Sequence, residues 1–250
     1  KTGGHHPDPF AADKVLYKID ASNMGKYAGL LTEGHKAMLN AYKDTYFLNV
    51  YPTRRSTAFP QRIYDATIAN ATSAKLAAGG NGVTGAIGGV PFPIPKEGVE
   101  VFWNHILRYR ADVAARNIGQ AAVTRSGDYT MVKFHDEAYF AYHLPGAKEA
   151  ELDNVIVYFL QETTAPARLA GEILLVHETL DQAKENRRAW LYNPGQRRVR
   201  RAPNVAFDNP GTASDGLRTS DQLDIMNGSP ERYDWKLVGK REMIVPYNSY

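Results

Sequence analysis

The stretch Asn154-Val-Ile-Val-Tyr-Phe-Leu-Gln161 holds an unbroken run of β-branched, aromatic and aliphatic residues. Such a run favours a β-strand that is apolar on both faces. A strand of this kind has to be covered on both sides, by helices, by other chain segments or by a bound ligand. We therefore take it as a central strand of a sheet and work outward from it.

Further strand patterns surround this stretch without long helical patterns between them. They lie at residues 128–134, 137–142, 172–176, 188–192 and 236–245, and we expect a turn at His135-Asp136 and another at Asn193-Pro-Gly195. Strands that follow one another directly are typical of an antiparallel meander rather than of βαβ units. The last pattern runs almost to Tyr250, and we expect more sheet to follow it. The sequence predicts an α+β fold whose sheet lies in the second half.

The first half has helical patterns. Apolar residues from 24 to 42 recur at spacings of three and four, interrupted by glycines, so we expect two short helices with Thr32 capping the second. Pro60 opens another helix, residues 79–95 form a Gly/Pro-rich loop, and residues 99–113 give the clearest helix. We expect residues 1–98 to form an arm, short helices and a loop that pack on the sheet. Residues 99–250 would then form a helix plus antiparallel sheet, incomplete at its C-terminal end.

Composition excludes several functional classes. The 250 residues carry a formal net charge of +3, too small to indicate nucleic-acid binding by itself. With no cysteine, the chain has neither disulfides nor thiolate metal sites. Apolar runs stay well short of the ~20 residues that cross a bilayer. The chain begins at Lys1 without a signal sequence, so we expect any targeting peptide to have been removed or never present.

Sequence matches to catalytic and cofactor-binding motifs lack the neighbouring strands, helices or residues that those motifs need. Gly80-Asn-Gly-Val-Thr-Gly85 matches the dinucleotide-binding pattern but lacks a preceding strand and a following helix. His177-Glu178 begins a zinc-protease pattern, but Asp181 stands where the second histidine is needed and the segment follows a strand. We therefore expect a non-enzymatic protein with no catalytic residue, no metal site and no cofactor.

Two groups of residues remain as candidates for binding. Apolar side chains of the 99–113 helix and of two strands would line an apolar cavity under that helix: Phe102, Trp103, Ile106, Val155, Val157, Phe159 and Trp190. The charge run Arg197-Arg-Val-Arg-Arg201 would contact an anionic membrane surface or partner. We expect Arg198 and Arg200 on opposite faces of a strand, so that not all four arginines share one site. A solvent-facing hairpin strand explains the same run equally well.

Several long motifs carry a family resemblance. They are Pro91-Phe-Pro-Ile-Pro95, Thr164-Ala-Pro-Ala-Arg-Leu-Ala-Gly171, the segment from Ala189 to Pro203 with its Trp-Leu-Tyr-Asn-Pro-Gly-Gln-Arg-Arg-Val-Arg-Arg core, and Asn227-Gly-Ser-Pro-Glu-Arg-Tyr-Asp-Trp-Lys-Leu-Val-Gly-Lys240. The chain resembles the bacterial family called domain of unknown function 1329, often labelled outer membrane lipoprotein-sorting protein. That family is similar to the lipoprotein carriers LolA and LolB. Its members start with a secretory signal and run well past the length of this chain.

The resemblance implies a strongly curved antiparallel sheet, an unclosed barrel with helices on its concave side and an apolar cavity between. It also implies a periplasmic or outer-membrane-associated location in a Gram-negative bacterium, and work beside an exporter of the resistance–nodulation–division type. Our first hypothesis is a carrier or chaperone that binds the acyl chain of a lipid or lipoprotein. The alternative is a ligand-free interaction module of an envelope export complex. An envelope enzyme ranks last. We expect peripheral membrane contact and no nucleic-acid partner.

Overall fold

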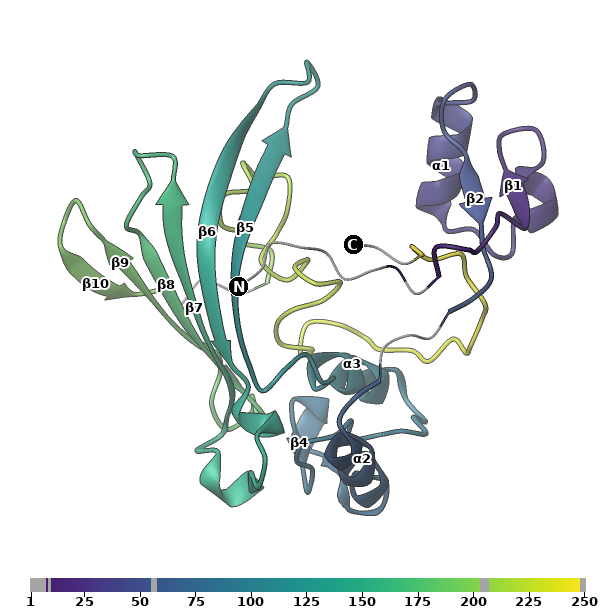
Figure 1. The fold of residues 1–250 in the computed structure, drawn as a ribbon. Helices are drawn as coiled ribbons and strands as arrows, with labels where there is room; N and C mark the ends of the chain where they lie inside the picture. The colour runs from purple at the N-terminus through teal and green to yellow at the C-terminus, as the bar shows by residue number, and fades with distance from the viewer. Residues whose placement is uncertain (1–7, 9, 55–57, 203–206, 248–250) are drawn as a thin grey trace. The chain divides into compact units, whose positions relative to one another are not determined.

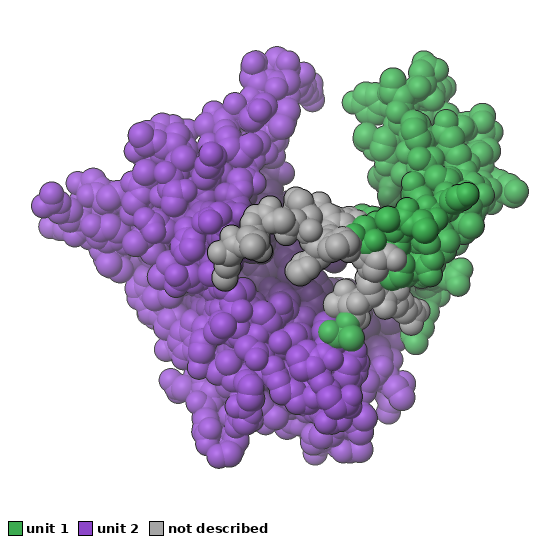
Figure 2. All heavy atoms as spheres, viewed as in Figure 1, with its two compact units in different colours: residues 1–58, 238–250 green, residues 59–237 purple. Residues whose placement is uncertain are grey.

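The computed structural model describes residues 8, 10–54, 58–202 and 207–247. The chain divides into two compact units (Figures 1 and 2). Unit 1 combines residues 1–58 with residues 238–250, and unit 2 contains residues 59–237. This division differs from the expected one between residues 98 and 99, because the end of the chain returns to pair with its beginning.

Unit 1 is a small α+β structure. Strands β1 (Tyr17–Ile19) and β2 (Leu48–Val50) pair antiparallel, joined by the 3-10 helix η1 (Met24–Tyr27) and helix α1 (Glu33–Ala41). The Thr32 hydroxyl accepts a 3.1 Å hydrogen bond from the His35 backbone N–H, which confirms Thr32 as the cap of a second short helix. Ile19, Leu31 and Leu39 form its buried core.

The strand expected at 236–245 is wrong. None of these residues joins a strand in the described chain. Gly239 has a φ of 131°, a conformation that interrupts a strand. The Ile244 backbone N–H donates a 2.9 Å hydrogen bond to the Leu30 carbonyl, which attaches this segment to unit 1.

Unit 2 is built on a six-stranded antiparallel sheet in the order β10-β9-β8-β7-β6-β5 (Figure 1). The strands are β5 (Val113–Val123), β6 (Tyr129–Tyr139), β7 (Val155–Ala165), β8 (Ile173–Thr179), β9 (Arg188–Asn193) and β10 (Arg198–Arg201). Every strand pairs with the next one in sequence, and the two end strands are not paired with each other. The predicted meander in an α+β fold is confirmed, and the sheet is not closed.

Two sequence predictions for the residues that lead into and form β5 and β6 are wrong. The predicted helix over 99–113 ends at Ile106, and Val113 already begins β5. The turn expected at His135-Asp136 is absent, because β6 runs straight through both residues and the hairpin turn lies at residues 124–128 instead. Asp136 is only 2% exposed and is held by polar side chains of neighbouring strands, so a charged residue continues the strand.

The helices of unit 2 meet the sheet at one end. They are α2 (Gln61–Ser73), which starts after Pro60 as predicted, and α3 (Gly98–Ile106); the remaining short elements are β3 (Lys75–Leu76), η2 (Ala78–Gly80), β4 (Val83–Thr84), η3 (Ala141–His143) and η4 (Glu149–Glu151). The main core joins Phe102 and Trp103 of α3 to Ile156 and Val157 of β7. This core fixes α3 at the start of β7, beside the site described next (Figure 1).

Candidate functional site

One face of the sheet carries a row of apolar residues that crosses five strands. Strand register places Ala114, Ala138, Phe159, Val176 and Ala189 directly beside one another, from β5 to β9. Because directly opposed residues of neighbouring strands project to the same face, all five lie on one side of the sheet. We call this side the cavity face and the opposite side the outer face.

A segment without helix or strand, residues 208–228, covers the cavity face. The side chain of Gln120 on β5 donates hydrogen bonds of 2.9 and 2.6 Å to the carbonyls of Thr212 and Ala213. At the other end of the segment, Arg187 donates a 2.8 Å hydrogen bond to the side-chain oxygen of Asn227. The covering segment is therefore tied to the sheet by polar contacts at both of its ends.

A cavity of about 580 Å³ remains between the sheet and the covering segment. Apolar side chains from the sheet, from α3 and from the covering segment line much of it: Ile106, Ala114, Ile118, Ala138, Phe140, Ile156, Val157, Phe159, Leu174, Val176, Leu223 and Met226. Small-molecule sites typically have volumes of about 300–1,000 Å³ and mostly apolar walls. The cavity thus has the size and lining of a ligand site.

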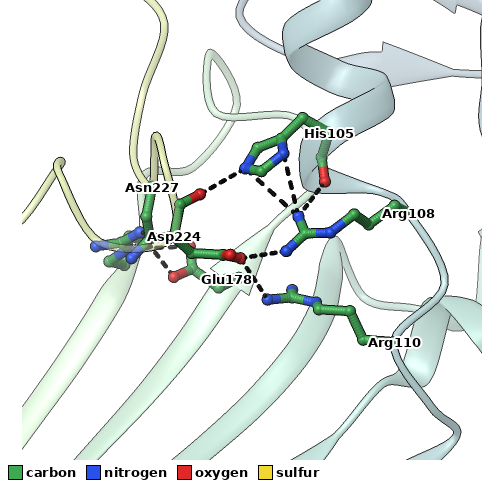
Figure 3. A network of polar contacts seen from close by, with 7 residues as sticks. His105, Arg108, Arg110, Glu178, Asp224 and Asn227 are labelled. Atoms are coloured by element: carbon green, nitrogen blue, oxygen red, sulfur yellow. Dashed lines mark hydrogen bonds and ion pairs between the residues drawn. The ribbon is translucent and has the colours of Figure 1, made fainter. Parts of the chain in front are cut away.

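Polar residues gather at the end of the cavity nearest α3 (Figure 3). The carboxylate of Asp224, from the covering segment, accepts a hydrogen bond from Arg108 and lies 3.4 Å from Arg110. His105 Nε2 donates to the Asp224 carbonyl at 2.7 Å, which leaves Nδ1 to accept from Arg108 at 3.3 Å. These contacts attach the covering segment to the residues at the end of α3.

A second ion pair lies across the strands next to this cluster. Arg187 Nε is 2.9 Å from Glu178 Oε2, and its Nη2 is 2.7 Å from Oε1, a two-point contact. The Arg187 side chain is only 10% exposed, so the pair is shielded from solvent. A paired arginine and glutamate with this geometry neutralise each other.

Further along the sheet, Asp136 forms a third polar contact within the cavity wall. Its carboxylate accepts hydrogen bonds from Arg116 Nε at 3.0 Å and from Gln161 Nε2 at 2.9 Å. Strand register brings the three side chains together, because Arg116 is opposite Asp136 and Asp136 is opposite Gln161. The apolar row therefore lies between two polar groups, this one and the α3 cluster.

The structure brings three of the seven apolar candidates together in the cavity wall: Ile106, Val157 and Phe159. Phe102 and Trp103 are buried in the main core instead of lining the cavity. A register shift between Val155 and Val157 changes which side chains reach the cavity: Ile156 lines it and Val155 does not. Of α3, only its last residue, Ile106, lines the cavity.

Trp190 does not share a face with Phe159, contrary to the prediction. It pairs with Leu175, whereas Phe159 pairs with Val176, so the two rings project to opposite faces. On the outer face a ladder of rings crosses four strands: Tyr139, Tyr158, His177 and Trp190, with successive centroids 6.1, 4.6 and 4.8 Å apart. The guanidinium of Arg201 extends this ladder over the Trp190 ring.

The arginine run forms the end strand of the sheet. Arg198, Arg200 and Arg201 belong to β10 and are exposed, and Arg197 has a φ of 51° in the preceding turn. Arg198 and Arg200 share a face, contrary to our expectation, because residues two apart on a strand project to the same side. Their strand partners, Asn193 and Leu191, show that this is the cavity face. Arg201 lies on the outer face.

Sequence reasoning missed the charged residues of the cavity. Arg108, Arg110, Arg187, Asp224 and Arg218 lie in segments that read as helix or loop, far apart in the chain. Only the pairing of Asp136 with Arg116 could have been predicted from the sequence. It required a strand that continues through His135 and Asp136 instead of turning there. The other contacts depend on how the covering segment folds.

Among the described residues, no group of three or more histidine, aspartate or glutamate side chains is arranged to hold a metal ion. In the same part of the chain, no helix is both long and apolar enough to cross a membrane.

Comparison with known proteins identifies a family but no activity. The family model described as protein of unknown function (DUF1329) matches residues 18–250. The uncharacterized protein PA3922 of Pseudomonas aeruginosa is 51% identical over 247 residues, which cover 99% of this chain and 54% of that protein. The chain thus spans about half the length of the relative that it matches. No solved structure matches the chain.

Proposed function

The chain belongs to the DUF1329 family, and we propose that it is a non-enzymatic carrier or chaperone that binds the acyl chain of a lipid or lipoprotein. The observation that carries this proposal is the cavity of about 580 Å³ above the apolar row of five strands. Three strand spacings separate Ala114 from Val176, so that part of the row spans about 14 Å. This space favours an elongated apolar ligand.

The energetics of acyl-chain burial fit such a role. Each methylene that leaves water contributes about 0.8 kcal/mol, so a chain needs no covalent chemistry to be held. Entry and release require only that the 208–228 segment move, since its ties to the sheet are hydrogen bonds and ion pairs. We also propose that the protein is related to the carriers LolA and LolB. It would act in the periplasm or at the outer membrane, together with an exporter.

A fluorescent fatty-acid probe tests the proposal. We expect the parent protein to bind the probe and Phe159→Asp to abolish binding, because a carboxylate would stand in the middle of the apolar row. Leu160→Asp is the matched control, since Leu160 is the next residue on β7 and faces the outer side. Circular dichroism of both variants checks that the fold survives. A folded parent protein that binds no acyl probe would overturn the carrier function.

The outer face favours the second candidate function, an interaction module of an envelope export complex. Apolar side chains remain exposed around the ring ladder, with Val113 62% and Tyr139 46% exposed. Together with Leu160 and Leu175 they line a shallow hollow. Exposed apolar patches of this kind are typical of protein contacts. Loss of partner binding in a Tyr139→Ser variant that still binds the acyl probe would assign the two faces to separate functions.

A further inference from the structure

The cavity contains more positive than negative side chains. Five arginines line it, Arg108, Arg110, Arg116, Arg187 and Arg218, against three carboxylates, Asp136, Glu178 and Asp224. A cavity for a purely apolar ligand needs no such excess. The excess of positive charge therefore needs a separate explanation.

Four of these arginines contact a carboxylate, but Arg108 and Arg110 share the one of Asp224. Arg187 makes a two-point contact with Glu178, and Arg116 is paired with Asp136. Arg108 hydrogen-bonds to Asp224. Arg218 donates to the backbone carbonyls of Thr219 and Thr212 and has no carboxylate partner in the described part of the chain.

Arg110 lies beside the apolar row and has no carboxylate to itself. Its nearest carboxylate is that of Asp224, at 3.4 Å, which Arg108 already uses. The guanidinium stands 5.0 Å from the ring centroid of Phe140, two residues beyond Ala138 on the chain. The Arg110 side chain is 39% exposed; partial desolvation, and then repulsion by Arg108, lowers its pKa. An anion at this position would relieve both effects.

We propose that the cavity selects an amphiphile with an anionic head group, held by Arg110, whose acyl chain follows the row Ala138, Phe159 and Val176. This inference rests on the proposed function and adds the chemical class of the ligand. A carboxylate or a phosphate accepts two parallel hydrogen bonds from one guanidinium, which matches the fork that Arg110 presents. The head group would complete the Arg108–Asp224–Arg110 cluster with a second negative charge.

Competition against a neutral fluorescent probe tests the head group separately from the chain. The probe is N-phenyl-1-naphthylamine, and the competitors are dodecanoate, dodecyl phosphate and dodecanol, all at concentrations below micelle formation. We expect both anions to compete about 10- to 100-fold more strongly than the alcohol, the range for charge-assisted hydrogen bonds. The ratio of dodecanoate to dodecyl phosphate tells a fatty-acid site from a phospholipid site.

Variants assign the effect to Arg110. Arg110→Gln should weaken both anions about tenfold or more and leave dodecanol and probe binding within about twofold. Arg110→Lys keeps the charge but loses the two-point contact, so it should fall between parent and Arg110→Gln. Arg125→Gln is the matched control, since Arg125 is exposed in the turn between β5 and β6 and lines no described cavity.

The outcomes separate the two proposals. If the probe binds and the three competitors act equally, the anionic head group is overturned and the acyl-chain cavity stands. An equal loss in Arg110→Gln and Arg125→Gln also overturns the head-group site, because it shows a general charge effect. If neither the probe nor any competitor binds the folded parent protein, the proposed function fails and this inference fails with it.

Discussion

Gly98 shows how one residue controls the packing near the cavity. A Cβ atom built there would lie 2.7 Å from the Lys236 backbone N and 2.8 Å from the Trp235 carbonyl carbon. The last segment of unit 2 thus passes directly over the start of α3, and the centroid of the Trp235 ring lies 4.8 Å from that of Phe102. Only glycine permits this approach of two backbones.

We expect Gly98→Ala to destabilise unit 2 by about 1–3 kcal/mol, the usual cost of overpacking, since backbone rather than a movable side chain has to give way. Urea unfolding measures the change. Gly195→Ala is the control, because its Cβ would meet only the Asn193 side-chain oxygen, at 3.3 Å. Equal unfolding midpoints for the two variants would contradict the close approach.

At the scale of elements, two histidines, one in η3 and one in β8, make the stability of the fold depend on pH. His143 in η3 donates from Nδ1 to the Gly88 carbonyl at 2.6 Å and is buried. Burial lowers its pKa below the ordinary value of 6.5, although the hydrogen bond to Gly88 opposes this. Burial and then Arg188 also lower the pKa of His177, which lies in the ring ladder of the outer face.

These lowered pKa values predict acid destabilisation. Below about pH 6.5 the unfolded chain binds protons that the folded histidines do not, so stability is full above that pH and falls as the pH decreases toward the folded pKa values. We expect the urea midpoint to drop between pH 7.5 and 5.5. His143→Gln and His177→Gln should each reduce the size of this drop. An unchanged pH dependence in both variants would exclude the histidines as its source.

At the scale of the whole molecule, the end strand of the sheet gives the chain a basic edge. All three arginines of β10 are exposed, and their hairpin presents Arg197 as well. Charge at an edge attracts anionic lipid headgroups over about 10 Å at 0.1 M salt and over a shorter distance at higher salt. A carrier that meets a membrane would use such an edge on arrival.

Replacing Arg197, Arg198, Arg200 and Arg201 by glutamine should weaken binding to anionic liposomes strongly at low salt and little at high salt. Liposome sedimentation at two salt concentrations measures this. The side chains are exposed, so the fold should survive, and circular dichroism checks it. Equal binding of parent and variant at low salt would show that the basic edge does not bind the membrane.

The order of strands could be predicted from sequence because a meander needs only local information. Runs rich in β-branched, aromatic and aliphatic residues mark strands β7, β8 and β9, and short connections make neighbours in sequence neighbours in the sheet. Prediction failed where polar residues interrupt the pattern: β5 has a mostly exposed face with small residues, and Asp136 continues β6 only because Arg116 and Gln161 pair with it. A strand held by contacts with other strands leaves no local signal.

The sequence by itself determined the α+β class, the antiparallel meander, the Thr32 cap of α1 and the family. Tertiary structure alone decided which side chains face the cavity: a register shift placed Ile156 there in place of Val155, and strand pairing sent Trp190 to the outer face. It also brought Asp224 to Arg108 and Arg110 across more than a hundred residues. Local patterns follow from the alternation of neighbouring residues, whereas a site between distant segments exists only once register and the path of the covering segment are set.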